Sequence, residues 1–465
     1  MSVAVLLAGV QVVPTVCIVA QPVTRASSAP PSRAATVAFI DSVALAALRD
    51  QPLPGLSVAV VKGRDTLVAK GYGFADLEND VAATPRTVYR IGSITKQFTA
   101  SAILQLAEQG KLSLDDELTK FFPDYPVRGN TVTVRHLLNH TSGIRSYTGL
   151  GPKWERVMRL DMAPDSMIAL FKDEPFDFAT GAQYKYNNSA YFLLGAIIEK
   201  VGGQPYGEYV RDKLFKPLDL ADTYYCEQRP LIKRRAQGYA PAPAGGFVNA
   251  DPLSMTQPYA AGSLCSTVLD LVAWTRALHE GKVVSAASLT QMTTPGKLTD
   301  GKPLTYGFGL SVGKLGEHRS IAHGGGINGF ITYAAHYPED TLTIVVLTNS
   351  GAGDPGRIER KIARRMFGVP EPAPKNLPLP AAESARFAGT YAQGNTRLRA
   401  LEQGGALVVE LPGGQRTKLL YQGAGRFVAA DNADMQVSFV PSTARAERMV
   451  LTQDGRMVFQ GTRAP

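Results

Sequence analysis

The stretch GSITKQFTASAILQLAEQ (residues 92–109) predicts a helix that carries a reactive serine at its start. The apolar residues of one helix face recur every four positions, at Ile94, Phe98, Ala102 and Leu106. Ser93 and Lys96 are three residues apart, so both side chains project from one face and the amine comes within reach of the hydroxyl. This spacing indicates a nucleophile beside a base, although a capping serine followed by a surface lysine gives the same letters.

Gly92 strengthens the chemical interpretation of this segment, because glycine allows a tight turn into the helix. The first turn of a helix has unpaired N–H groups and a partial positive charge. Such a position can stabilise the oxyanion that develops during acyl transfer.

A second motif, Tyr186-Asn187-Asn188, precedes the helical run SAYFLLGAIIEKV (189–201). A phenol near an ammonium group loses its proton more easily and can act as a base, and an asparagine amide can bind a substrate carbonyl or hold the lysine. The alternative is structural: Asn188 or Ser189 caps the helix and Tyr186 packs against its first turn.

A third motif, His323-Gly324-Gly325-Gly326, lies between two β-rich runs. Small residues on a strand let a substrate backbone approach closely, and they leave an N–H group available as a second oxyanion donor. A glycine-rich hairpin turn is the alternative.

The β-rich runs lie at the two ends of a long segment with mostly helical periods between them. Residues 56–63 and 65–73 form a predicted hairpin, and residues 306–349 contain further strands joined by glycine-rich turns. This order predicts an α/β (α+β) fold, in which an antiparallel sheet is flanked by helices and an all-α subdomain is inserted. We assign residues 36–367 to this domain.

The segment 368–382 contains five prolines and is expected to be a semi-stiff linker. Short β-rich runs then follow one another over residues 383–465, separated by Gly, Asp and Asn. Their even spacing predicts a small all-β barrel or sandwich, without a catalytic motif of its own.

Residues 1–35 are interpreted as a leader and flexible segment. An apolar run over residues 3–20 is followed by small and polar residues, as in a secretory signal, although no Lys or Arg precedes the run. Gln11 and Pro14 interrupt it, which disfavours a stable membrane span. We expect an exported protein, periplasmic or secreted. Whether Cys226 and Cys265 pair is left open by their spacing.

Composition and charge exclude several classes of function. The chain has 465 residues, 45% of them hydrophobic, and a net charge of +9, but its basic residues do not form the compact patch of a nucleic-acid-binding protein. His136 and His140 have the spacing of a metal pair but lack the glutamate of HExxH and a third ligand. Residues 351–356 match GxGxxG, but no strand follows to complete a dinucleotide-binding unit. No metal or cofactor is expected.

Taken together, the motifs and their order resemble the class C β-lactamase-related serine hydrolases, which include penicillin-binding carboxypeptidases, D-aminopeptidases, β-lactamases and esterases. The resemblance covers roughly residues 40–365 and rests on SITK and on the segments 132–144, 184–200, 262–278 and 306–330. It implies the serine β-lactamase/DD-peptidase fold. The C-terminal runs resemble the lipocalin-like barrels that several of these relatives carry.

The resemblance also implies roles for individual residues. Ser93 is the nucleophile, Lys96 activates it, and Tyr186 is the general base and leaving-group acid. Asn188 and Gly325 belong to the substrate-binding motifs, and the N–H groups of Ser93 and Gly326 are the oxyanion donors. The implied substrate is a small molecule or short peptide, cell-wall peptides included, and the oligomeric state is left open.

His323 departs from the β-lactamase pattern, which has a lysine at this place. Lysine is a permanent cation for the carboxylate of a β-lactam or a D-alanine terminus, whereas a histidine side chain is ordinarily mostly neutral at pH 7. We therefore expect a D-amino-acid peptidase, carboxypeptidase or esterase. Weak β-lactamase activity, or capture of penicillin without turnover by a sensor, is the alternative.

Overall fold

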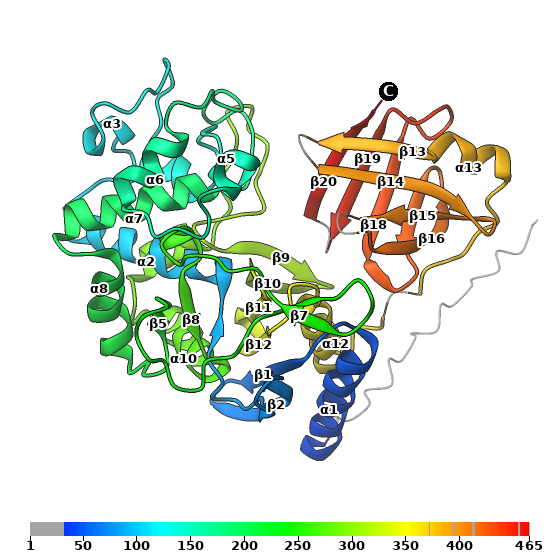
Figure 1. Cartoon of the computed structure of the whole chain (residues 1–465), viewed down its shortest axis with the longest axis horizontal. Coiled ribbons are helices and arrows are strands. Elements are labelled where there is room, and N and C mark those ends of the chain that lie inside the picture. Colours follow the sequence, from blue (N-terminus) through cyan, green and yellow to red (C-terminus); the bar gives the residue numbers. More distant parts are fainter. Residues whose placement is uncertain (1–31, 372, 394–395, 412–413, 454–455, 465) are drawn as a thin grey trace, which may run out of the picture.

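The computed structural model describes residues 32–371, 373–393, 396–411, 414–453 and 456–464 (Figure 1). The predicted export signal lies almost entirely in residues 1–31, outside this part of the chain. Among the described residues, no helix combines the length and the apolar character that crossing a membrane requires.

The predicted antiparallel sheet is confirmed, and it joins segments from both ends of the N-terminal domain. In the described part of the chain it has seven strands, in the order β3-β2-β1-β12-β11-β10-β9. The strands are β1 (Gly55–Lys62), β2 (Asp65–Asp76), β3 (Val81–Ala82), β9 (Ser311–Leu315), β10 (His318–Ile327), β11 (Phe330–Tyr337) and β12 (Leu342–Thr348). The pairing of β1 with β12 brings the two ends of the domain together, with Val58 opposite Val346.

Helices cover both faces of this sheet, and the alternation of side chains along β12 shows why. Ile344 and Val346 pack with α1 (Arg33–Asp50) and α12 (Pro355–Phe367) on one face. Val345 and Leu347 belong to the larger core on the other face. A strand buried on both sides reads as a continuous apolar run, which is the pattern of residues 344–347.

The larger core continues into the helical region inserted between β4 (Tyr89–Arg90) and β9. Its three longest helices are α2 (Thr95–Glu108), α7 (Asn188–Gly202) and α10 (Val268–His279). The shorter helices are α3 (Leu118–Phe121), α4 (Val134–Leu138), α5 (Pro152–Glu155), α6 (Pro164–Phe171), α8 (Tyr206–Val210), α9 (Tyr259–Gly262) and α11 (Ala286–Met292). Short strands complete it: β5 (Tyr224–Tyr225), β6 (Tyr239–Pro241), β7 (Phe247–Asn249) and β8 (Leu264–Ser266).

The C-terminal segment forms a closed barrel, as the sequence predicted. In the described residues it has eight antiparallel strands, and β13 pairs with β20 to close it. The strands are β13 (Gly389–Gln393), β14 (Thr396–Gln403), β15 (Ala406–Glu410), β16 (Arg416–Gly423), β17 (Arg426–Ala429), β18 (Asn432–Val440), β19 (Arg448–Gln453) and β20 (Arg456–Arg463). Before them, α13 (Ala381–Phe387) places Phe387 in the barrel core.

Asp434 on β18 links the barrel to the N-terminal domain. Asp434 accepts hydrogen bonds from Arg360 Nε and Arg364 Nη2 of α12, both at 2.8 Å. The side chains of Arg360 and Arg364 are only 8% and 11% exposed. Removal of one partner from a nearly buried, hydrogen-bonded ion cluster is costly, because it leaves charges that are neither hydrated nor paired as before.

Asp434→Ala is expected to lower the free energy of unfolding by about 3 kcal/mol, because two nearly buried guanidinium groups lose their shared carboxylate. Chemical denaturation measures this. Asp431→Ala, which removes an exposed carboxylate from the preceding turn, is the matched control and should stay within about 0.5 kcal/mol of the wild type. Equal losses in the two variants would contradict the assignment.

Candidate active site

Ser93 lies in a single 3-10 turn (Gly92–Ile94) that leads directly into α2. Gly92 has φ +51°, a left-handed conformation that favours glycine. A Cβ atom at Gly92 would lie 2.9 Å from the backbone nitrogen of Gly326 on β10. Only glycine therefore allows the turn before the nucleophile to lie against the edge of the sheet.

Lys96 is fully buried, and its amine joins three segments of the chain. The Nζ atom lies 3.1 Å from Ser93 Oγ and 2.8 Å from Asn188 Oδ1 at the start of α7. It is also 2.8 Å from the carbonyl oxygen of Ala261 in α9. Burial holds the pKa of Lys96 well below its ordinary value, because the charged form loses its hydration.

These three contacts suit a neutral amine. Its two N–H bonds can donate to the carbonyl oxygens of Asn188 and Ala261, which only accept. Nζ can donate to Ser93 Oγ when it is charged, and in the neutral form its lone pair can accept the proton of the Ser93 hydroxyl across the same 3.1 Å contact. The arrangement is that of a nucleophile and a general base.

Asn188 is the first residue of α7, and its amide is held in one orientation. Its Nδ2 donates to Thr148 Oγ1 at 3.3 Å, which leaves Oδ1 for Lys96. The helix cap is made by the neighbouring Asn187, whose side chain accepts from the N–H of Ala190. Capping therefore falls to Asn187 and not to Asn188 or Ser189, and Asn188 faces the lysine.

Tyr186 completes the group around Ser93. The Lys96 amine lies 4.7 Å from the centroid of its ring, and the phenol forms a hydrogen bond with Ser93. The residue keeps 37% of its surface exposed. Its hydroxyl end is nevertheless buried, which raises the pKa of the phenol, while the bond to Ser93 acts in the opposite direction. The phenol is thus held as a proton donor.

The glycines of β10 bring a second N–H group to the nucleophile. Thr332 Oγ1 on β11 donates to the carbonyl of Ile91 at 2.9 Å, which fastens the segment before Ser93 to the sheet. A Cβ at Gly325 would lie 2.0 Å from that carbonyl oxygen, whereas a Cβ at Gly326 would meet nothing within 4 Å. Gly325 is therefore a packing requirement, and Gly326 borders open space beside the N-terminal turn of Ser93.

His323 lies on the same strand but is only 5% exposed. Its Nε2 is 2.8 Å from the hydroxyl of Tyr306, and its Nδ1 is 2.6 Å from the carbonyl of Gly324. Because a carbonyl only accepts, Nδ1 carries a proton. Both ring nitrogens are therefore already engaged in hydrogen bonds with neighbouring residues.

Comparison with known proteins places this arrangement in a family. The family described as Beta-lactamase matches residues 40–366. The chain belongs to the Beta-lactamase family. Among curated relatives, penicillin-binding protein 4* of Bacillus subtilis is 27% identical over 425 residues, which covers 86% of this chain and 93% of that protein.

Solved structures of the Beta-lactamase family agree with the fold. The octameric penicillin-binding protein homologue from Pyrococcus abyssi has a TM-score of 0.65 at 26% identity, covering 92% of this chain and all (100%) of that one. A D-stereospecific amidohydrolase from Streptomyces sp. has a TM-score of 0.62 at 31% identity, covering 73% and 100% of the two chains. Penicillin-binding proteins and D-amino-acid amidohydrolases are thus both among its relatives.

Two contributors to the site were missed by the sequence interpretation. Ala261 acts through its carbonyl, which no side-chain pattern reveals. His140 was considered only as half of a metal pair, yet its fully buried ring lies 4.4 Å from the ring of Tyr186 and 4.7 Å from that of Tyr306. Its Nδ1 accepts from the N–H of Asn187 at 3.1 Å, so it positions the tyrosine segment.

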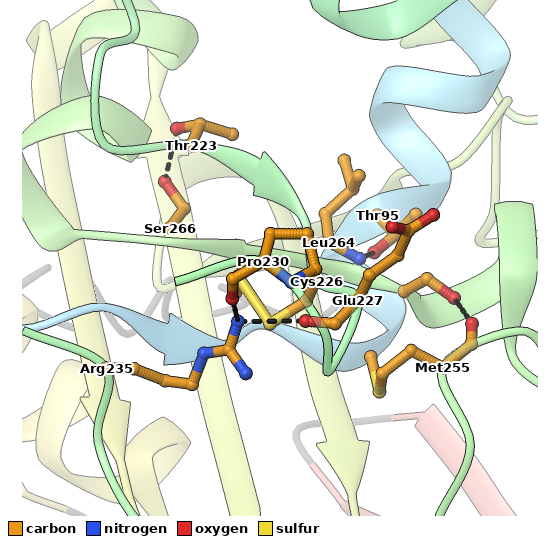
Figure 2. The surroundings of a disulfide bond; sticks show 11 residues. Thr95, Thr223, Cys226, Glu227, Pro230, Arg235, Met255, Leu264 and Ser266 are labelled. Carbon is orange, nitrogen blue, oxygen red and sulfur yellow. Dashed lines mark hydrogen bonds between the residues drawn. A yellow bond between two sulfur atoms is a disulfide. The ribbon is translucent and has the colours of Figure 1, made fainter. Parts of the chain in front are cut away.

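Cys226 and Cys265 form a disulfide, whose surroundings Figure 2 shows. It links the end of β5 to β8, and the next residue towards the site, Leu264, donates its N–H to Thr95 Oγ1 at 3.1 Å. The crosslink therefore holds the strand that follows α9, the helix whose Ala261 binds the lysine.

Gly325→Ala is expected to slow the labelling of Ser93 by a fluorophosphonate at least tenfold, because the new methyl group would force the Ile91 carbonyl away from β10. Gly324→Ala is the matched control on the same strand, because its methyl group would make only ordinary contacts, 3.4 Å from Tyr333 and 3.7 Å from the Thr332 carbonyl, and it should label at close to the wild-type rate. Labelling that is slowed equally in both variants would contradict the packing role of Gly325.

Proposed function

We propose that this protein is an exported serine hydrolase that forms an acyl-enzyme at Ser93 on small amides, peptides or esters of D-amino acids. One observation carries the proposal: the fully buried Lys96 amine, with its lowered pKa, lies 3.1 Å from Ser93 Oγ. A base whose pKa is lowered, so that its neutral form becomes accessible, beside a hydroxyl is the requirement for acylation. Relationship to a D-stereospecific amidohydrolase supports the substrate class.

The acylation step follows from the contacts. Lys96 accepts the proton of the Ser93 hydroxyl as Oγ bonds to the substrate carbonyl carbon. The N–H groups of Ser93 and Gly326 stabilise the oxyanion. When the bond to the leaving group breaks, Tyr186 donates a proton to the leaving group. Tyr186 then takes up the proton that Lys96 had accepted from Ser93. Water then attacks the ester, and the same groups return the proton to Ser93.

The environment of His323 supports amides and esters over β-lactams. The ring is nearly buried and engaged by Tyr306 and Gly324, so it does not provide the exposed, permanent cation that a lysine would. The competing activities are slow β-lactam hydrolysis and formation of a penicillin acyl-enzyme that is not turned over. Assays with amides, esters and β-lactams distinguish them from the proposed activity.

Export is part of the proposal. A disulfide between Cys226 and Cys265 supports it, because such bonds persist in oxidising compartments outside the cytosol. The apolar N-terminal run supports it independently.

A substrate panel tests the function. Purified protein is expected to hydrolyse D-alanyl or D-phenylalanyl amides faster than the L-forms and to hydrolyse nitrocefin slowly, with Ser93→Ala inactive on all of them and unlabelled by fluorophosphonate. Turnover that survives in Ser93→Ala would overturn the mechanism. Rapid hydrolysis of nitrocefin without hydrolysis of the amides would show that the substrates are β-lactams and not D-amino-acid amides. A stable penicillin adduct without turnover would indicate a sensor.

The pH dependence of kcat/KM tests the role of Lys96. The base works only when neutral, so the rate should rise with pH through its lowered pKa and reach a plateau well below the ordinary lysine value of 10.5. Lys96→Arg should lose at least about 10²-fold, since a guanidinium does not release its proton. Lys62→Arg, at an exposed position, is the matched control. A wild-type rise centred near pH 10.5 would contradict a neutral lysine.

A further inference from the structure

A cavity of about 330 Å³ lies beside the turn between β10 and β11 and is lined by two arginines. Arg90 belongs to β4, and Arg235 is brought beside it by backbone pairing. Val88 donates its N–H to Arg234 and accepts from Ala236, both at 2.9 Å. The position of the two cations side by side is therefore fixed by the backbone.

Neither arginine has a carboxylate partner in the described part of the chain. Arg90 forms no side-chain hydrogen bond there and rests 5.9 Å from the centroid of the Phe330 ring. Arg235 donates from Nη2 to the carbonyls of Glu227 and Pro230, as Figure 2 shows. Its Nε is buried without a partner among these residues.

Two cations in one partly buried cavity repel each other. Burial, followed by the charge of Arg235, lowers the pKa of Arg90 to about 10. Burial also lowers the pKa of Arg235. The acidic residue that lines the cavity, Asp251, is 3.1 Å from Arg159 and is mostly exposed, so its charge is already engaged. The cavity therefore has unbalanced positive charge, which an anion would neutralise.

The cavity is close to the nucleophile along two chain segments. Arg90 precedes Ser93 by three residues, which span at most about 11 Å. Asn328, another lining residue, follows Gly326 by two residues, or at most about 7 Å. The backbone positions that line the cavity are therefore near those of Ser93 and Gly326, on the same two chain segments.

The structure also indicates on which side of Gly326 the leaving group and the acyl portion of a substrate lie. His323 and Asn328 lie on opposite sides of Gly326 along the chain. The ring of Tyr186, the proposed leaving-group acid, is 6.1 Å from the ring of His323. The leaving group therefore lies on the His323 side of Gly326, and the acyl portion extends toward Asn328 and the two arginines.

We propose that Arg90 and Arg235 form a binding site for a carboxylate or a comparable oxyanion, located beyond the acyl end of the catalytic site. Paired guanidinium groups present several N–H donors and suit such planar anions. Use of this site by a substrate carboxylate rests on the proposed function, whereas binding of the anion itself does not.

The binding test uses full-length Ser93→Ala protein, so that it is independent of turnover. Isothermal titration with succinate and with sulfate is expected to show binding that weakens at least tenfold in Arg90→Met and in Arg235→Met. Arg64→Met, which removes an exposed arginine from the turn between β1 and β2, is the matched control and should bind as the parent does. Arg90→Lys keeps the charge and should recover most of the affinity, which separates charge from packing on Phe330.

A kinetic experiment distinguishes a carboxylate that is part of the substrate from a free anion. With the active protein, N-succinyl-D-alanyl p-nitroanilide should have a KM at least fivefold below that of the N-acetyl compound, and Arg90→Lys should preserve this ratio while Arg235→Met reduces it to near one. Binding of succinate without that preference assigns the site to a free anion. Absence of binding in the parent protein, or binding that both methionine variants retain, would overturn the proposal whether or not the enzyme hydrolyses amides.

Discussion

The buried amine of Lys96 is the constraint around which the site is built. An amine without water is stabilised by oxygen partners or by loss of its proton; here Lys96 has oxygen partners, and burial lowers its pKa. Its partners are Asn188 of α7 and Ala261 of α9, which are 73 residues apart in the sequence, and Ser93 in the turn just before its own helix. The packing of the helical region therefore determines the surroundings, and with them the basicity, of the lysine that we propose as the base.

A second constraint joins this helical region to the sheet. The backbone of Gly92 and the strand segment at Gly325 approach so closely that neither position has room for a side chain. Thr332 reinforces the contact through its bond to Ile91. The nucleophile belongs to the helical core, whereas the glycine donor belongs to the sheet, so the oxyanion site exists only where the two layers meet.

The elements of the fold could be predicted because they depend on local periodicity. The four-residue apolar repeat of α2, the β1–β2 hairpin and the even spacing of the barrel strands are visible in the sequence. The Ala261 carbonyl, the Cys226–Cys265 disulfide and the neighbouring Arg90 and Arg235 could not be, since each depends on segments that meet only in the folded chain. His323 could be recognised as a departure, but its engagement by Tyr306 could not.

The distribution of charge along β10 connects these observations. At the His323 end the ring is enclosed by Tyr306 and Gly324, so an anionic leaving group finds no fixed cation there. At the Asn328 end two arginines remain without a carboxylate partner in the described residues. A substrate lying along the strand past Gly326 would therefore be oriented by its acyl end. In that orientation the leaving group needs only a proton from Tyr186, and a simple amide or ester satisfies this condition without a terminal carboxylate.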